Sequence, residues 1–316
     1  TNGVRYKTNR YMLGSLETKG EYKPNFLDYQ TYLSISPSKR WQIDFIGNIS
    51  ENHYNFTPHD RETNFGTMEN VKSFKVYFDG HEKDVFRTLF GSLTLTRKFT
   101  ESTSLSLIAS AFSTKEQERY DIQGQYWLTQ TETSENLGVG TYMEHARNYL
   151  KASVAHVQLR FAHKKRKHDV LGALAYRYEN IEEKSREYEM RDSSGYSIPH
   201  TADDLKLIYS LAAKNTLKAN HIEGFLQDTW RFTSAHEHTL FTLNHWQFNG
   251  ETTVSPRVSL GIIPAFNHDV VLRLATGLYY QAPFFKEVRD TTTVNGITYA
   301  SLNKKIKSQC SIHFIA

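Results

Sequence analysis

The sequence predicts an all-β chain that forms about ten to twelve antiparallel strands of a transmembrane β-barrel. Three features of the sequence indicate this fold class. Apolar and polar residues alternate along many short segments, the connections between these segments alternate between short and long, and aromatic residues gather near the segment ends.

The composition is polar and yet rich in aromatic residues. Charged residues make up 23% of the 316 residues, aromatic residues make up 13%, and the mean hydropathy is -0.58. Disordered chains have few aromatic residues and a large net charge, whereas the formal net charge here is +4. We therefore expect a folded chain that is rich in β-strands.

Composition also excludes several classes of protein. Basic residues only slightly outnumber acidic residues, and they are spread along the chain, so no nucleic-acid partner is expected. Cys310 is the one cysteine, which excludes a disulfide framework and a cysteine-rich metal site. No stretch approaches the ~18 apolar residues of a membrane helix. The densest basic run, 163–169, is predicted to be a solvated turn, with a nucleic-acid or anion site as the alternative.

The first half of the chain contains four segments with a period of two. Segments 28–36 and 41–50 alternate Leu, Ile, Trp or Phe with polar residues. Segments 87–99 and 104–112 alternate Leu or Ala with Ser or Thr. Only a few polar residues separate the two members of each pair. Both pairs are therefore predicted to be β-hairpins.

The second half continues the pattern. The expected strands there are 149–161, 170–178, 222–232, 238–248, 255–264, 270–281 and 309–315. In the hairpin of 255–281, Leu260 and Leu274 fall on the apolar face, and Arg257 and Arg273 fall on the opposite face. Segment 238–248 is a few residues short, which leaves the register of its hairpin open. The total is about eleven strands of the ~9 to 11 residues that a tilted membrane strand needs.

The lengths of the connections separate a membrane barrel from a soluble sandwich. The short connections are 37–40, 98–103, 163–169, 233–238 and 264–269, and they alternate with long polar connections at 51–85, 113–148 and 179–220 and a medium one at 249–254. One end of the sheet would then carry tight turns and the other long loops. Outer-membrane barrels segregate their loops in this way, and soluble sandwiches have no reason to do so.

Aromatic residues are placed as in two membrane-interface girdles. Near the short turns lie Trp41, Phe99, Phe161, Trp230 and Phe232, and toward the long connections lie Tyr149, Tyr176, Tyr178 and Tyr280. Such girdles flank the apolar band of membrane barrels. The alternative explanation is that strands favour aromatic residues in general.

Five phrases of the sequence together resemble one family. They are FDGHEKDVFRTLFG at 78–91, YDIQGQYWL at 120–128, IEGFLQDTWRF at 222–232, SPRVSLGIIP at 255–264 and LRLATGLYYQAPFFKEVRD at 272–290. The set is similar to the barrel of TonB-dependent outer-membrane receptors, and in particular to those of Bacteroidetes that carry an amino-terminal carboxypeptidase-regulatory-like domain. The resemblance covers nearly all of 1–316.

The resemblance implies a 22-stranded barrel filled by a plug domain, with an upstream segment that contacts TonB. The chain lacks an initial Met and stops in an expected strand. We therefore expect 1–316 to be an internal part of a longer receptor, without the plug, the amino-terminal domain and the closing strands. About half of the barrel would be present.

Several polar residues are expected to face the barrel interior. These candidates for lumen or plug contact are Gln227, Thr229, Arg231, Arg257, Arg273 and Gln281. Arginines on this face could bind plug carboxylates with two hydrogen bonds each. The alternatives are contact with the solute and no special role, since buried polar residues need partners whatever the function.

The expected loops offer three aromatic candidates for solute contact, Tyr120, Tyr126 and Trp127. They could stack on a sugar or on a flat siderophore, or they could pack the loops together.

No catalytic constellation, cofactor motif or metal site is expected. His221, His236, His238 and His245 lie close in sequence, but a zinc site needs three or four ligands in tetrahedral geometry, and this spacing does not supply them. An ordinary turn and strand is the favoured interpretation of this histidine group.

These observations predict a receptor in the outer membrane of a Gram-negative bacterium that takes up a scarce nutrient such as a siderophore, glycan or peptide by TonB-coupled transport, and no enzyme. Expected partners are outer-membrane lipid, the plug, TonB, the nutrient and a surface lipoprotein. The alternatives are a passive porin or adhesin, and a soluble secreted module that binds glycans.

Overall fold

A computed structural model describes residues 1–8, 20–67, 70–192, 205–231, 235–264 and 270–316. The described residues form one 16-stranded sheet, in which twelve strands follow one another along a single path, β1-β3-β4-β6-β7-β8-β9-β10-β11-β12-β13-β16. All neighbours on this path pair antiparallel. The predicted all-β class and the predicted ten to twelve strands are confirmed.

The strands of the path are β1 (Asn2–Thr8), β3 (Asn25–Ser38), β4 (Trp41–Pro58), β6 (Asn70–Thr100), β7 (Thr103–Gln130), β8 (Glu135–Lys165), β9 (His168–Arg191), β10 (Lys206–Arg231), β11 (Ala235–Trp246), β12 (Glu251–Ile262), β13 (Leu272–Gln281) and β16 (Gln309–Ile315). Four further strands lie off the path, β2 (Gly20–Tyr22), β5 (Arg61–Thr67), β14 (Arg289–Val294) and β15 (Ile297–Leu302).

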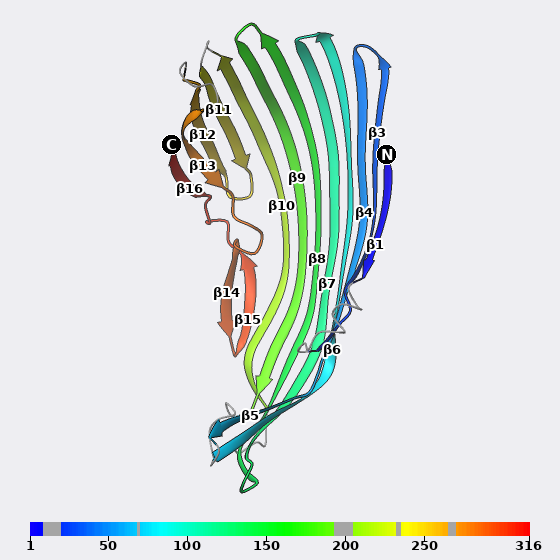
Figure 1. Ribbon diagram of the computed structural model, residues 1–316, viewed down its shortest axis with the longest axis vertical. Helices are drawn as coiled ribbons and strands as arrows, with labels where there is room; N and C mark the ends of the chain where they lie inside the picture. Colours follow the sequence, from blue (N-terminus) through cyan, green and yellow to red (C-terminus); the bar gives the residue numbers. More distant parts are fainter. Residues whose placement is uncertain (9–19, 68–69, 193–204, 232–234, 265–269) are drawn as a thin grey trace.

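The sheet is open, with β1 at one edge and β16 at the other (Figure 1). The β3–β4, β6–β7 and β8–β9 hairpins turn within two residues each, at 39–40, 101–102 and 166–167. These turns gather at one end of the sheet, drawn at the top of Figure 1, whereas β5 and the β7–β8 connection lie at the other end. Three of the expected tight turns therefore lie at one end, and the expected turns 233–238 and 264–269 fall partly outside the described residues. The opposite end is not reserved for long loops, because a short turn at 131–134 joins β7 to β8 there. Within the described residues, no helix is long and apolar enough to cross a membrane.

The expected strand lengths are wrong for the middle of the sheet. β6 and β8 are each 31 residues long, and β9 is 24. Consequently most of the expected long loops, 51–85, 113–148 and 179–220, is strand, and the chain from β7 to β8 turns within 131–134. Sequence alternation marks a strand only where one face is apolar. Beyond that region both faces are polar, and backbone hydrogen bonds continue the strands without a hydrophobic signal.

β10 is longer than its neighbour β11, and a hairpin covers the difference. β11 pairs with β10 from His221 to Arg231 without a register shift, so the expected hairpin is in register although β11 is short. Farther along β10, residues Leu211 to Ala213 pair in parallel with β15, and β14 pairs with β15. The hairpin lies beside β10 in Figure 1. It supplies backbone partners for three of the β10 residues that β11 does not reach.

The described residues contain little buried apolar core. One cluster comprises Leu217, Ala219, Trp246 and Val288, with partly buried side chains around it. Val288 belongs to the segment just before β14, so this cluster attaches the β13–β16 connection to the sheet. The single layer of strands is not the two-layer sandwich with a shared dry core that a soluble β-domain of this length would need.

Candidate functional site

The register of the strands assigns each candidate residue to one of two faces. We call the face that carries Gln227 and Arg257 the polar face, and the face that carries Leu174 and Leu274 the apolar face. Directly paired residues share a face, and faces alternate along each strand. The six residues expected at the barrel interior, Gln227, Thr229, Arg231, Arg257, Arg273 and Gln281, all lie on the polar face of β10, β12 and β13.

Some of these polar residues already have partners within the sheet. Arg231 forms an ion pair with Asp169 at 3.0 Å. The guanidinium of Arg257 lies 4.2 Å from the ring centroid of Tyr279, and its buried Nε has no hydrogen-bond partner among the described residues. Thr229 and His238 share a hydrogen bond of 2.9 Å. Contact with a plug or a solute stays a prediction for all six.

The three aromatic candidates for solute contact lie in β7 and not in a loop. Tyr120 pairs with Ala146, and Tyr126 pairs with Gly140, both on the polar face. Trp127 points to the apolar face, where 37% of its surface is exposed. Residues that alternate along one strand point to opposite faces, so the three side chains do not form one surface.

The described histidines of the group have other partners or lie on opposite faces of the sheet. His221 is 2% exposed, shares a hydrogen bond of 2.9 Å with Glu179 and stacks on Trp246. His245 lies on the apolar face and bonds to Thr252, whereas His238 lies on the polar face. The side chain of His236 is outside the described part of the structure. Among the described residues no three His, Cys, Asp or Glu side chains come together as a metal site.

An acidic surface on the polar face was not predicted from the sequence. It spans β6 to β9 beyond the rows of apolar residues, and its members are Glu82, Asp84, Glu116, Glu118, Glu144, Glu183, Glu187 and Glu189. The acids are two residues apart within strands, which is the spacing that brings side chains to one face. In a loop, a spacing of two does not bring side chains to one face, so the sequence prediction of loops here did not indicate an acidic surface.

Crowding of these carboxyl groups changes their protonation. Burial and the neighbouring Asp84 carboxylate, with which Glu82 shares a hydrogen bond, raise the pKa of Glu82 to about 7. Burial and the charge of Glu118 raise the pKa of Asp84, which is 7% exposed. Burial, followed by the charges of Glu187 and Glu118, raises the pKa of Tyr120 to about 12.

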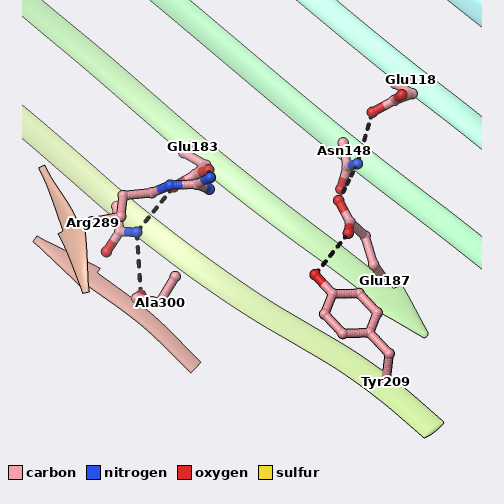
Figure 2. A network of polar contacts seen from close by, with 8 residues as sticks. Glu118, Asn148, Glu183, Glu187, Tyr209, Arg289 and Ala300 are labelled. Carbon is pink, nitrogen blue, oxygen red and sulfur yellow. Dashed lines mark hydrogen bonds and ion pairs between the residues drawn. The ribbon is translucent and has the colours of Figure 1, made fainter. Parts of the chain in front are cut away.

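Two hydrogen-bond networks organise the acidic surface (Figure 2). In the first, the Asn148 side-chain amide donates to Glu118 at 2.8 Å and to Glu187 at 2.6 Å, and the Tyr209 hydroxyl donates to Glu187 at 3.2 Å. In each case a neutral donor satisfies a carboxylate without neutralising its charge.

The second network connects the β14–β15 hairpin to β9. Arg289 forms an ion pair with Glu183, whose side chain is 6% exposed. Asn215 donates to Glu183 at 2.9 Å and to the backbone carbonyl of Ala300 at 3.2 Å. Between the two networks lies a pocket of about 520 Å³, which Phe284 also lines. This pocket is open, acidic and partly aromatic.

Similarity to known proteins is found in structure and not in sequence. No family model and no curated protein sequence matches the chain. Among solved structures, the outer membrane transporter YddB from Escherichia coli is similar, with 9% sequence identity and a TM-score of 0.38. The match covers 89% of this chain and 44% of that protein, so the chain spans less than half of the transporter's length.

Proposed function

We propose that the chain is part of the wall of an outer-membrane β-barrel that transports a solute. The observation that carries this proposal is an unbroken apolar row across nine strands, in which directly paired residues share the apolar face. The row runs Ile35, Ile43, Leu95, Leu107, Leu159, Leu174, Gly224, Leu243, Val254. Leu174 is 62% exposed and Ile35 is 59% exposed. A continuous apolar surface of this extent needs an apolar solvent.

The apolar region crosses the strands obliquely, as tilted membrane strands require. On β3 the exposed apolar residues extend from the row away from the tight turns, to Leu33 and Leu27. On β12 and β13 they extend toward the tight turns instead, to Val258, Leu272 and Leu274. A horizontal apolar band over strands tilted by about 35–45° produces this displacement from strand to strand.

The height of the apolar region also matches a membrane. On β6 it extends from Leu89 to Phe99, and both side chains are about half exposed. The ten steps from Leu89 to Phe99, at about 3.4 Å each and tilted by about 40°, span about 26 Å. Membrane barrels have an apolar band of about 25 Å.

At the turn end, exposed Trp41, Phe161 and Trp230 fit the expected aromatic girdle, while Phe232 is outside the described residues.

We further propose that this transport is coupled to TonB and that the solute is a scarce nutrient. It is supported by the resemblance of the sequence to TonB-dependent receptors, by the polar face of Arg257 and Arg273, and by the open edges, which require further strands of the same protein or a partner. The plug, TonB and a surface lipoprotein are proposed partners, and a Gram-negative bacterium of the Bacteroidetes is the proposed source.

Uptake by cells that express the full-length protein tests this proposal. A radiolabelled candidate nutrient should accumulate, and accumulation should stop when the proton gradient is collapsed. Uptake that continues without the gradient would identify a passive porin. A full-length protein that fractionates as a soluble molecule would contradict the membrane position itself and favour a secreted binding module.

A further inference from the structure

Beyond the apolar region, the same face of the sheet becomes strongly basic. Three consecutive rows of paired residues carry the basic side chains, together with Lys218 on β10. The basic residues are Lys83, Arg87, Lys115, Arg119, Arg147, Lys151, Lys184, Arg186, Lys214 and Lys218. The acids of these rows are Glu51 and Glu182. The opposite face of the same strands carries the acidic surface, so the sheet is charged oppositely on its two faces.

Several basic residues lie directly opposite one another. Lys115 pairs with Lys151 across β7 and β8, and Lys184 pairs with Lys214 across β9 and β10. Like charges directly opposite on neighbouring strands destabilise a sheet. All four lysines are exposed, and within the described residues none of them forms an ion pair. Glu182, opposite Lys151, is the one acid beside these lysines in their rows, so an anion from outside the chain would stabilise the arrangement.

A third row contains three arginines, with Arg119 opposite Arg147 and Arg147 opposite Arg186. Arg147 forms an ion pair with Asp121 of the next row. Arg87 is also paired, with Glu51 at 2.7 Å. These two ion pairs neutralise part of the basic surface and leave the lysine pairs as its uncompensated centre.

The four lysines surround a hollow of about 300 Å³. Tyr149 and Glu182 line it from the same face. Glu116 and Glu183 also contribute to its wall, but they alternate with the lysines and direct their side chains to the polar face, where Arg289 pairs with Glu183. Lys115 and Lys151 lie one row from Ser113 and Ser153, which border the apolar region. The basic hollow is therefore continuous with the proposed lipid-facing surface.

We propose that this hollow binds the anionic, phosphorylated headgroup of a membrane lipid. The inference rests on the proposed function, since it places the apolar region in the membrane. A lipid whose acyl chains cover Leu89 carries its headgroup one to two rows farther along the strands, at the level of the lysines. Tyr149 lies at this level, where tyrosine is favoured in membrane interfaces. Each lysine near an anionic lipid surface strengthens binding.

Lipid selectivity of the full-length protein tests the proposal. The protein is reconstituted into phosphatidylcholine vesicles that contain a trace of spin-labelled phosphatidic acid or, in parallel, spin-labelled phosphatidylcholine. The relative association constant of the two labelled lipids is then read from the motionally restricted fraction. We expect phosphatidic acid to be favoured by at least about fivefold, and the combined K115Q, K151Q, K184Q and K214Q variant to bring the ratio close to one.

The control variant combines K72Q and K286Q. Lys72 lies near the far end of β6, and Lys286 lines the pocket on the polar face. Its ratio should equal that of the unmodified protein. In 1 M salt the selectivity of the unmodified protein should fall, because the Debye length is then about 3 Å, and this measurement needs no variant to fold.

Three outcomes would overturn the inference: equal association of both lipids, an unchanged ratio in the lysine variant, or an equal loss in the control. A protein that restricts both lipids without preference would refute the headgroup site and leave the membrane proposal standing. A protein that restricts neither lipid would refute both.

Discussion

At the scale of single residues, neighbours in one strand have opposite surroundings. Leu274 is 54% exposed on the apolar face, and it pairs with Leu260. The next residue, Ala275, lies on the polar face and pairs with Ser259 and Ile315. Under the proposed membrane position, the side-chain period of two converts one step along the chain into a change of solvent, from lipid to the barrel interior.

This change of solvent makes a sharp prediction. Leu274→Arg in the full-length protein should lower the free energy of unfolding by about 2–4 kcal/mol, because an arginine near the middle of the membrane has no partner in lipid. Ala275→Arg should cost much less. Denaturant unfolding in bilayers measures both. Equal losses, or a larger loss at Ala275 in a barrel from which the plug is deleted, would show that the two faces are assigned wrongly.

Glu82 predicts a pH dependence in the part of β6 beyond the apolar region. Its pKa is raised to about 7 by burial and by Asp84, whereas an unfolded glutamate titrates near pH 4.3. The unfolded chain therefore releases this proton first, and stability should fall as the pH rises from about 4.5 through about 7. Hydrogen exchange of β6 and β7 amides should show less protection at pH 8 than at pH 5, after correction for intrinsic rates.

Glu82→Gln should remove most of this pH dependence, since it keeps the hydrogen bond to Asp84 without the titration. Glu62→Gln is the control, because Glu62 is solvent-exposed and its pKa is lowered by Lys75 and Ser73. A Glu82→Gln variant with an unchanged pH profile would contradict the assignment of the shifted pKa to this carboxyl group.

At the scale of elements, the β14–β15 hairpin covers part of the free edge of β10. Its backbone pairing with β10 covers only Leu211 to Ala213. The hairpin is also held by the Arg289–Glu183 ion pair and by the apolar contacts of Val288. The ion pair and the apolar contacts therefore attach the segment after β13 to the sheet near β10, although β13 itself lies three positions from β10 in the sheet.

Arg289→Ala should detach this hairpin. The substitution leaves the Glu183 carboxylate, which is 6% exposed, without its charged partner, and loss of one member of a buried ion pair costs roughly 3–5 kcal/mol. Amides of β14 and β15 should exchange faster, and the segment should become sensitive to protease. Adding Glu183→Gln should restore part of the protection, and Lys286→Ala should have little effect. No recovery in the double variant would show that Arg289 acts in another way.

At the scale of the whole molecule, the described sheet has two open edges and one large apolar face. Unpaired strands and exposed apolar patches both promote aggregation. The chain of 316 residues, expressed alone in buffer, should be insoluble and should require detergent. Analytical ultracentrifugation checks this expectation, and a monodisperse, soluble monomer without detergent would count against a lipid-facing surface.

The sequence by itself determined the class of fold, the tight-turn end and the two faces of the strands. The sequence assigned Leu260 and Leu274, and also Trp41 and Phe161, to a face or an end of the sheet. This was possible because a strand with one apolar face has alternating apolar and polar residues, which is a local property of the sequence. The polar face of Gln227 and Arg257 follows from the same alternation.

Only the tertiary structure decided how far the strands extend and what gathers on them. β6 to β10 continue through segments with two polar faces, where backbone pairing leaves no hydrophobic period to detect. The acidic surface around Glu118 and Glu187 and the opposed Lys115 and Lys151 depend on cross-strand register. Register joins residues about thirty to forty positions apart in the chain, and local sequence does not specify which of them become neighbours.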